Sequence, residues 1–139
     1  MIQLEQARTV IAAARAHGRE HGLKPLTLVV LDAGGHVVAS EREDGSGYGR
    51  PQIAQGKAAG ALAMGTSSRV LGEMAADRPT FIAALSVAWD GKLIPAAGGV
   101  LIRDDAGTLL GAIGISGDLS DKDEGAALAG IQAAGLHAG

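Results

Sequence analysis

The chain has 139 residues, a formal net charge of −3 and a hydrophobic fraction of 47%, which is typical of one compact domain covering residues 1–139. It contains no cysteine and only three aromatic residues, which excludes disulfides, thiolate metal sites, cysteine nucleophiles and multi-base stacking platforms. The acidic balance gives no attraction to a nucleic-acid backbone, and no apolar run approaches the roughly 18 residues of a membrane-spanning helix. We therefore expect a cytoplasmic protein that binds neither nucleic acid nor membranes.

Apolar periodicity and turn residues predict alternating hairpins and helices along the chain. The expected elements are an amphipathic helix from Leu4 to Gly18 or Gly22, strands over 26–31 and 37–40, a helix over 51–64, a helical segment over 68–76, strands over 99–103 and 108–116, and a helix over 121–136. Residues 81–89 fit either a helix or a strand. Because both strand pairs flank short turns, we expect an α+β domain with one antiparallel sheet and helices packed on its faces.

Two charged side chains fall on apolar stripes of the predicted helices. Lys57 is four residues after Ile53, and Glu124 shares its stripe with Leu128 and Ile131. A buried, unpaired ammonium group costs several kcal/mol, so Lys57 needs a carboxylate, a ligand or a route to water. The alternatives are that Lys57 extends along the sheet edge to solvent and that Glu124 merely favours the positive end of its helix.

Two histidines are spaced four residues apart at the end of the first predicted helix. His17 and His21 continue the stripe of Val10 and Ala14, so both imidazoles border a buried face. They are candidate metal ligands, although the sequence lacks a third ligand at the usual spacing, and they could instead satisfy the last carbonyl groups of the helix. We expect His36, at a hairpin turn, and His137, near the chain end, to be exposed to solvent.

The last predicted helix follows a glycine-rich strand. Ser120 and Asp123 fit a capping box at the start of this helix. The preceding run, Gly111–Gly117, has the spacing G-x-x-G-x-x-G rather than that of a dinucleotide-binding turn, and the acidic residues after it would repel a pyrophosphate. We therefore do not expect a nucleotide site at this turn.

Several short motifs together resemble one known family over nearly the whole chain. They are Arg42-x-Asp44-Gly45, Ala54-x-x-Lys57-Ala58, Gly98-Gly99-Val100 with Ile102, and Gly111-x-Ile113-Gly114-Ile115-Ser116-Gly117 followed by Asp123-Glu124 and Ala127. Their order and spacing resemble the GlcG/HbpS family, the haem-degrading-domain family that also supplies the C-terminal domain of the PduO corrinoid proteins. The sequence departs from the family pattern at Glu43, where an apolar residue is usual, and at Leu101, where proline is common.

The resemblance implies a profilin-like α+β fold with about five antiparallel strands, assembly into dimers or larger homo-oligomers, and binding of haem or a related tetrapyrrole, in association with small-molecule catabolism. The positions that match the family pattern are Arg42, Asp44, Lys57, Gly98, Gly99, Ser116, Gly117, Asp123 and Glu124. The small Gly and Ala side chains on the helix faces also favour self-association, because they leave low apolar patches for a second copy.

Two functional hypotheses follow. In the first, the protein binds haem, with His17 or His21 as the iron ligand and with a cofactor-binding site that includes Arg42, Gly98, Gly99 and Ser116. Arg42, Arg50 and Lys57 are the expected partners of the propionates. In the second, the protein is a cofactor-free enzyme, and Lys57, Glu124 and Asp44 perform acid–base chemistry on a small anionic metabolite. Under either hypothesis we expect the pocket where the 108–116 strand meets the last helix, with Lys57 and Glu124 lining it.

Overall fold

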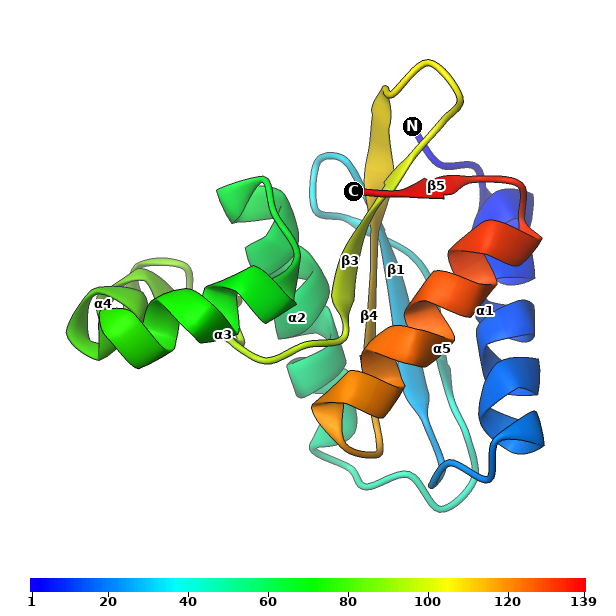
Figure 1. Cartoon of the computed structure of the whole chain (residues 1–139), viewed down its shortest axis with the longest axis horizontal. Helices are drawn as coiled ribbons and strands as arrows, with labels where there is room; N and C mark the ends of the chain where they lie inside the picture. The colour runs from blue at the N-terminus through cyan, green and yellow to red at the C-terminus, as the bar shows by residue number, and fades with distance from the viewer.

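The computed structural model describes residues 1–139 as a five-stranded antiparallel sheet with helices on both faces (Figure 1). In chain order the elements are α1 (Leu4–Glu20), β1 (Thr27–Asp32), β2 (Val37–Arg42), α2 (Arg50–Met64), α3 (Ser68–Asp77), α4 (Pro79–Ala88), β3 (Gly99–Arg103), β4 (Leu109–Ser116), α5 (Ser120–Ala133) and β5 (His137–Ala138). The predicted α+β class is confirmed.

The strand order in the sheet is β2-β1-β4-β3-β5, and every neighbouring pair is antiparallel. Both predicted hairpins, β1–β2 and β3–β4, are present, and β1 joins them by pairing with β4. The two-residue strand β5 was not predicted. The last helix ends earlier than expected, at Ala133, and Gly135 then turns the chain with a φ of 73° towards β3.

Two hydrophobic clusters occupy the two faces of the sheet. The larger cluster, of 17 buried residues, joins α1 and α5 to one face, and a cluster of seven joins α2 to the other. Glycine allows α2 to lie unusually close to the sheet, because a Cβ atom on Gly114 of β4 would come within 1.9 Å of the Ala54 carbonyl oxygen. The helices are therefore fixed to the sheet by backbone contact as much as by side-chain interdigitation.

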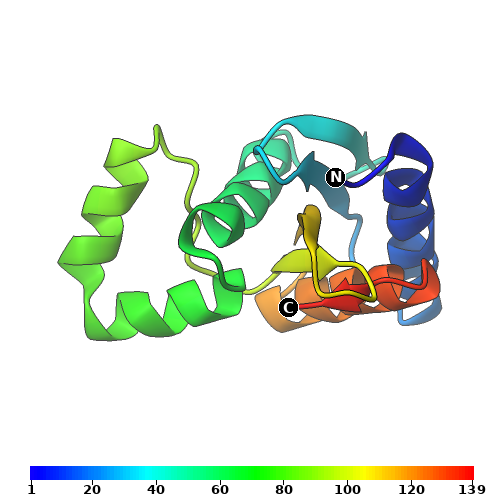
Figure 2. The same cartoon turned by 90° about the horizontal axis from the view of Figure 1, so that it is seen from above.

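Helices α3 and α4 form an arm, residues 68–88, that extends away from the sheet (Figures 1 and 2). The arm has its own small cluster, in which Leu71 of α3 and Ile82 of α4 contact Leu93. Ile82 is the one buried residue of α4, although that helix is mostly apolar. Residues 81–89, which fitted either a helix or a strand, belong mainly to α4, where Pro79 fits the first helical turn.

Candidate functional site

The ammonium group of Lys57 is buried at the end of β4. The side chain, 3% exposed, extends from α2 and donates hydrogen bonds to the Ile115 carbonyl oxygen at 2.9 Å and to Oδ2 of Asp123 at 3.2 Å. The other carboxylate oxygen of Asp123 accepts a hydrogen bond from the Asp118 backbone amide at 2.9 Å. No buried side-chain nitrogen or oxygen atom in the protein lacks a partner. Of the three possibilities for Lys57, namely a carboxylate, a ligand or a route to water, the structure shows a carboxylate, that of Asp123.

Burial shifts the pKa values of both members of this pair towards neutral forms. Desolvation lowers the pKa of Lys57, and it outweighs the attraction of Asp123, while the nearby charge of Arg50 lowers this pKa further. Desolvation likewise raises the pKa of Asp123, against the hydrogen bonds and the positive charge that lower it. Removing either partner would leave the other charge buried and uncompensated, so the two depend on one another.

Glu124, which was predicted to line a pocket together with Lys57, binds Arg69 of the arm. Its two carboxylate oxygens accept hydrogen bonds from the guanidinium group at 2.8 to 3.1 Å. The predicted capping box is wrong, because Leu119 is the N-cap residue of α5 and no side chain caps the helix. Asp123 reaches back to the Asp118 amide from within the first turns instead.

The glycine pair at the start of β3, Gly98 and Gly99, makes room for Lys57. Gly98 has a φ of +128°, and a Cβ atom there would come within 2.9 Å of the Lys57 ammonium nitrogen. A Cβ atom on Gly99 would come within 2.2 Å of the Lys57 carbonyl oxygen, and the Gly99 amide donates to Oγ of Ser68 at 2.7 Å. Both predicted cofactor-binding glycines are buried in this contact between α2, the arm and β3.

Arg42 and Ser116 lie at the same end of the sheet, because Thr27 of β1 pairs in register with both of them. Oγ of the buried Ser116 accepts a hydrogen bond from Arg50 at 3.0 Å. Arg42 donates to the Ser46 carbonyl oxygen at 2.8 Å. The predicted binding residue Ser116 and all three predicted propionate partners, Arg42, Arg50 and Lys57, are thus hydrogen-bonded within the chain.

Glu43, one of the departures from the family pattern, is held by two arginines of α1. Its side chain is 8% exposed and accepts hydrogen bonds from Arg15 at 3.3 Å, Arg19 at 3.1 Å and the Leu26 amide at 2.7 Å. A carboxylate at this position is therefore compensated by opposite charges. The neighbouring Asp44 is exposed and borders an open pocket of about 220 Å³ next to the same arginines. Lys57 and Glu124 accordingly have different partners, and the Asp44 side chain lies apart from both, at this pocket.

The two histidines of α1 stack on one another at its C-terminal end. Their ring centroids are 4.0 Å apart, and the ring planes differ by 21°. Nδ1 of the exposed His21 lies 2.9 Å from the His17 carbonyl oxygen, which can only accept a hydrogen bond. Nδ1 is therefore the donor in this contact, and in the neutral form of the ring Nε2 of His21 carries the lone pair. The half-buried His17 lies against α5 at Gly125.

The other two histidines are also exposed, as predicted, and each is next to an aspartate. Nδ1 of His36 lies 3.2 Å from Asp32 in the β1–β2 turn. Nε2 of His137 lies 2.7 Å from Asp105, at the edge of a pocket of about 510 Å³ between α5 and β5. No group of three or more His, Cys, Asp or Glu side chains is arranged to hold a metal ion. None of the helices is long and apolar enough to span a membrane.

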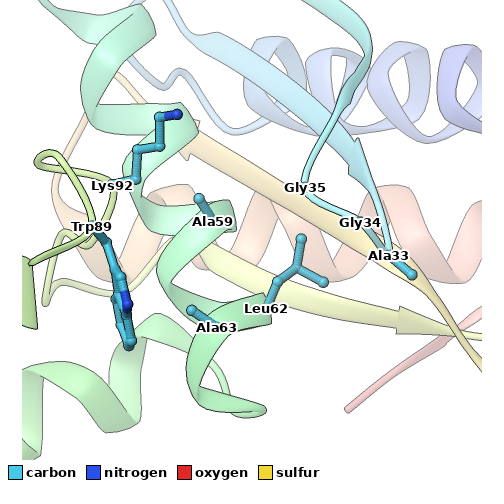
Figure 3. A pocket seen from close by; sticks show the side chains of 8 residues that line it. All are labelled: Ala33, Gly34, Gly35, Ala59, Leu62, Ala63, Trp89 and Lys92. Carbon is cyan, nitrogen blue, oxygen red and sulfur yellow. The ribbon is translucent and has the colours of Figure 1, made fainter.

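Sequence reasoning missed a third pocket, of about 330 Å³, on the outer face of α2 (Figure 3). Its lining includes Trp89, the only tryptophan of the chain, and Lys92. The single signal in the sequence was the rarity of tryptophan itself. Lys57 and Glu124 line neither this pocket nor the two described above.

The protein is an α+β domain in which α2 packs closely on an antiparallel sheet. Glycines and the buried Lys57–Asp123 pair lie at the junction between the sheet and the helices. The chain belongs to the HbpS-like family: the family described as "Haem degrading protein HbpS-like" matches residues 2–132. No curated protein sequence matches the chain.

Solved structures share this fold over almost the whole chain. The PduOC–haem complex is 24% identical, with a TM-score of 0.87, and the match covers 98% of this chain and 96% of that one. Protein ORFY of Klebsiella pneumoniae is 21% identical, with a TM-score of 0.86 and coverage of 96% and 90%. A double mutant of HbpS from Streptomyces reticuli is 25% identical, with a TM-score of 0.80 and coverage of 94% and 85%. The five-stranded α+β architecture is thus shared with these proteins.

Proposed function

We propose that this protein binds haem or a related tetrapyrrole through the histidines at the end of α1. Membership of the HbpS-like haem-degrading family is the observation that carries the proposal. A structural relative that was crystallised with haem supports it. Bound haem would supply an iron centre able to bind or activate small molecules.

His21 has the geometry that an iron ligand requires. Its Nδ1–H donates to the His17 carbonyl oxygen, which fixes the ring and leaves Nε2 as the nitrogen able to bind iron. The stacked His17 ring limits rotation of His21 about its side-chain bonds. These features favour His21 over His17 as the ligand.

The surroundings of His21 offer cations and apolar surface. The Lys24 amide binds the Asp118 carboxylate, which brings the β4–α5 turn, with its 69% exposed Leu119, next to the segment that follows α1. The charges of Lys122 and Lys24 both act on Asp118, whose pKa is lowered chiefly by its hydrogen bond from the Lys24 amide. Neither Lys24 nor Lys122 takes part in an ion pair of the protein, and we propose them as partners of the propionates. This end of one chain is an open surface, so a second copy would be needed to enclose the macrocycle.

Titration of the purified protein with haemin is expected to produce a Soret shift that saturates at one haem per chain. His21→Ala should abolish the shift, because it removes the only α1 imidazole with a fixed free Nε2, and His17→Ala should weaken it. His36→Ala and His137→Ala are the matched controls and should bind haemin like the wild type. A shift that survives His21→Ala and is lost in His137→Ala would contradict the proposal.

Self-association is the second part of the proposal, and we assign it to α4. Val87 is 80% exposed and Phe81 is 37% exposed on a helix that is mostly apolar. An exposed apolar helix of this kind is typical of a subunit interface. Sedimentation should therefore find dimers or larger assemblies at micromolar concentration.

Val87→Glu is expected to shift this assembly towards monomer, because it places a charge in the apolar contact. Leu128→Glu changes an exposed leucine of α5, 42% exposed, and should leave the assembly state unchanged. A wild-type protein that sediments only as a monomer would count against the role of α4.

The alternative of a cofactor-free enzyme that uses Lys57, Glu124 and Asp44 stays a prediction. It receives no support from the geometry, since the Lys57 ammonium group is buried and Glu124 binds Arg69.

A further inference from the structure

The groove on the outer face of α2 lies on the opposite side of the sheet from the α1 histidines. Its floor is formed by Ala59, Leu62 and Ala63 of α2. One wall is the β1–β2 turn at 33–35, and the other is formed by Trp89 and Lys92, after α4. Figure 3 shows these two walls on either side of α2. We call it the Trp89 groove.

Both walls of the Trp89 groove are held in place by hydrogen bonds. In the β1–β2 turn, the Asp32 carboxylate accepts hydrogen bonds from the amides of Gly34 at 2.9 Å and His36 at 3.0 Å. Beyond Trp89, the Ile94 amide donates to the Gly56 carbonyl oxygen of α2 at 3.3 Å. A Cβ atom on Gly56 would meet the Ile94 side chain at 2.5 Å, so this wall lies directly on α2. The groove is thus preformed.

The lining of the groove selects one kind of ligand chemistry. Two alanine side chains give a low, smooth floor on which a flat ring can lie, and the half-buried Trp89 supplies an aromatic surface beside it. Lys92 is the only titratable side chain of the lining, it is exposed, and it takes part in none of the ion pairs of the protein. Asp90, two residues earlier, does not line the groove. A single positive charge therefore stands at the edge of an apolar, flat-bottomed groove.

We infer that the Trp89 groove binds a small planar aromatic carboxylate, whose ring lies on α2 against Trp89 and whose carboxylate meets Lys92. A volume of about 330 Å³ is near the lower end of ligand pockets and suits one or two rings, not a macrocycle. This site is independent of the proposed haem site.

Trp89 makes the inference directly testable, because with excitation at wavelengths that tyrosine does not absorb the emission comes from this one indole, and a bound iodinated ring would quench it by contact. The probes are 4-iodobenzoate and its uncharged analogue 4-iodobenzyl alcohol. We expect 4-iodobenzoate to quench in a saturable manner, with a dissociation constant of about 0.1–1 mM. Lys92→Gln should weaken the binding of 4-iodobenzoate by about three- to fivefold, the upper part of the range for an exposed ion pair. It should leave the binding of the alcohol unaffected.

Two further variants locate the binding site. Ala63→Leu fills the floor of the groove and should weaken the binding of both probes. Arg8→Gln removes an exposed charge of α1, outside the groove, and should bind both probes like the wild type. Far-UV circular dichroism of each variant verifies that the helices are intact.

Three outcomes would overturn the inference. The first is quenching that rises linearly without saturation in every variant, which indicates collision alone. The second is equal affinity of wild type and Lys92→Gln for 4-iodobenzoate. The third is equal affinity of wild type and Ala63→Leu for both probes, which would place the probes away from the floor of the groove. Haem binding is tested separately, by the Soret band and the His21→Ala variant. Either proposal can therefore fail while the other holds.

Discussion

Replacing Asp123 with alanine is expected to lower the free energy of unfolding by about 3–5 kcal/mol, as removal of one partner from a buried ion pair does. The substitution leaves the Lys57 ammonium group buried, with the Ile115 carbonyl oxygen as its remaining hydrogen-bond partner. It also removes the acceptor of the Asp118 amide in the turn before α5. Urea unfolding followed by far-UV circular dichroism measures the effect.

Asp121 provides the matched control, because it lies in the same helix turn with a side chain that is 85% exposed. Asp121→Ala should leave the free energy of unfolding unchanged. A double variant with Lys57→Met and Asp123→Ala should recover part of the lost stability, since no uncompensated charge then remains in the interior. If Asp123→Ala unfolds at the same urea concentration as wild type, the Lys57–Asp123 pair does not stabilise the fold.

Gly114→Ala is expected to lower the free energy of unfolding by about 3 kcal/mol or more, which is the upper range for overpacking a protein interior. The new Cβ atom would lie 1.9 Å from the Ala54 carbonyl oxygen and 3.0 Å from the Ala58 amide nitrogen. Both neighbours are backbone atoms of α2, so no side-chain rotation relieves the contact, and α2 must move off the sheet. The midpoint of thermal unfolding should fall correspondingly.

Gly125→Ala tests the same chemical change at an open position. In α5 the nearest atom to its added Cβ would be Nε2 of His17, at 3.9 Å, an ordinary contact distance. Because alanine favours helix more than glycine does, this variant should be stabilised by about 0.5–1 kcal/mol. Equal stability of the two variants would show that the distance between α2 and β4 does not limit the side chain at position 114.

Glu124 was expected in one pocket with Lys57, whereas the carboxylate that pairs with Lys57 is that of the neighbouring Asp123, and the difference has a physical cause. Sequence reasoning oriented α5 by its large apolar side chains and placed Glu124 on the stripe of Leu128, which is 42% exposed. The face that is actually buried carries Asp123, together with small residues such as Ala127 and Gly130. A Cβ atom on Gly130 would come within 2.4 Å of the Val10 carbonyl oxygen of α1. The inner face of α5 is therefore defined by the close approach of α5 to α1 rather than by the size of its side chains.

The strands were predictable because each hairpin pairs residues close in sequence across a short turn. The pairing of β1 with β4 joins residues far apart in the chain, such as Thr27 and Ser116, and no local pattern reports it. The two-residue strand β5 is too short to show any alternation of apolar and polar residues. Helix α4 carries apolar residues on nearly every side, so no periodicity distinguished it from a strand.

The Trp89 groove escaped prediction for a related reason. Its lining comes from three segments, at 33–35, 59–63 and 89–92, and none of them carries a motif. Alanine and glycine contribute shape rather than chemistry, so only the tertiary arrangement reveals the groove.

The arm has its own hydrophobic cluster. We therefore expect the arm and the sheet to differ in the free energy needed to open them. Leu71, Ile82 and Leu93 belong to neither of the clusters that bind helices to the sheet, so the arm can lose its structure while the sheet keeps its own contacts. Such a unit opens with a smaller free energy than the whole molecule. The amide protons of α4 should therefore exchange with solvent before those of β4, and Trp89 emission should report the melting of the arm rather than of the sheet.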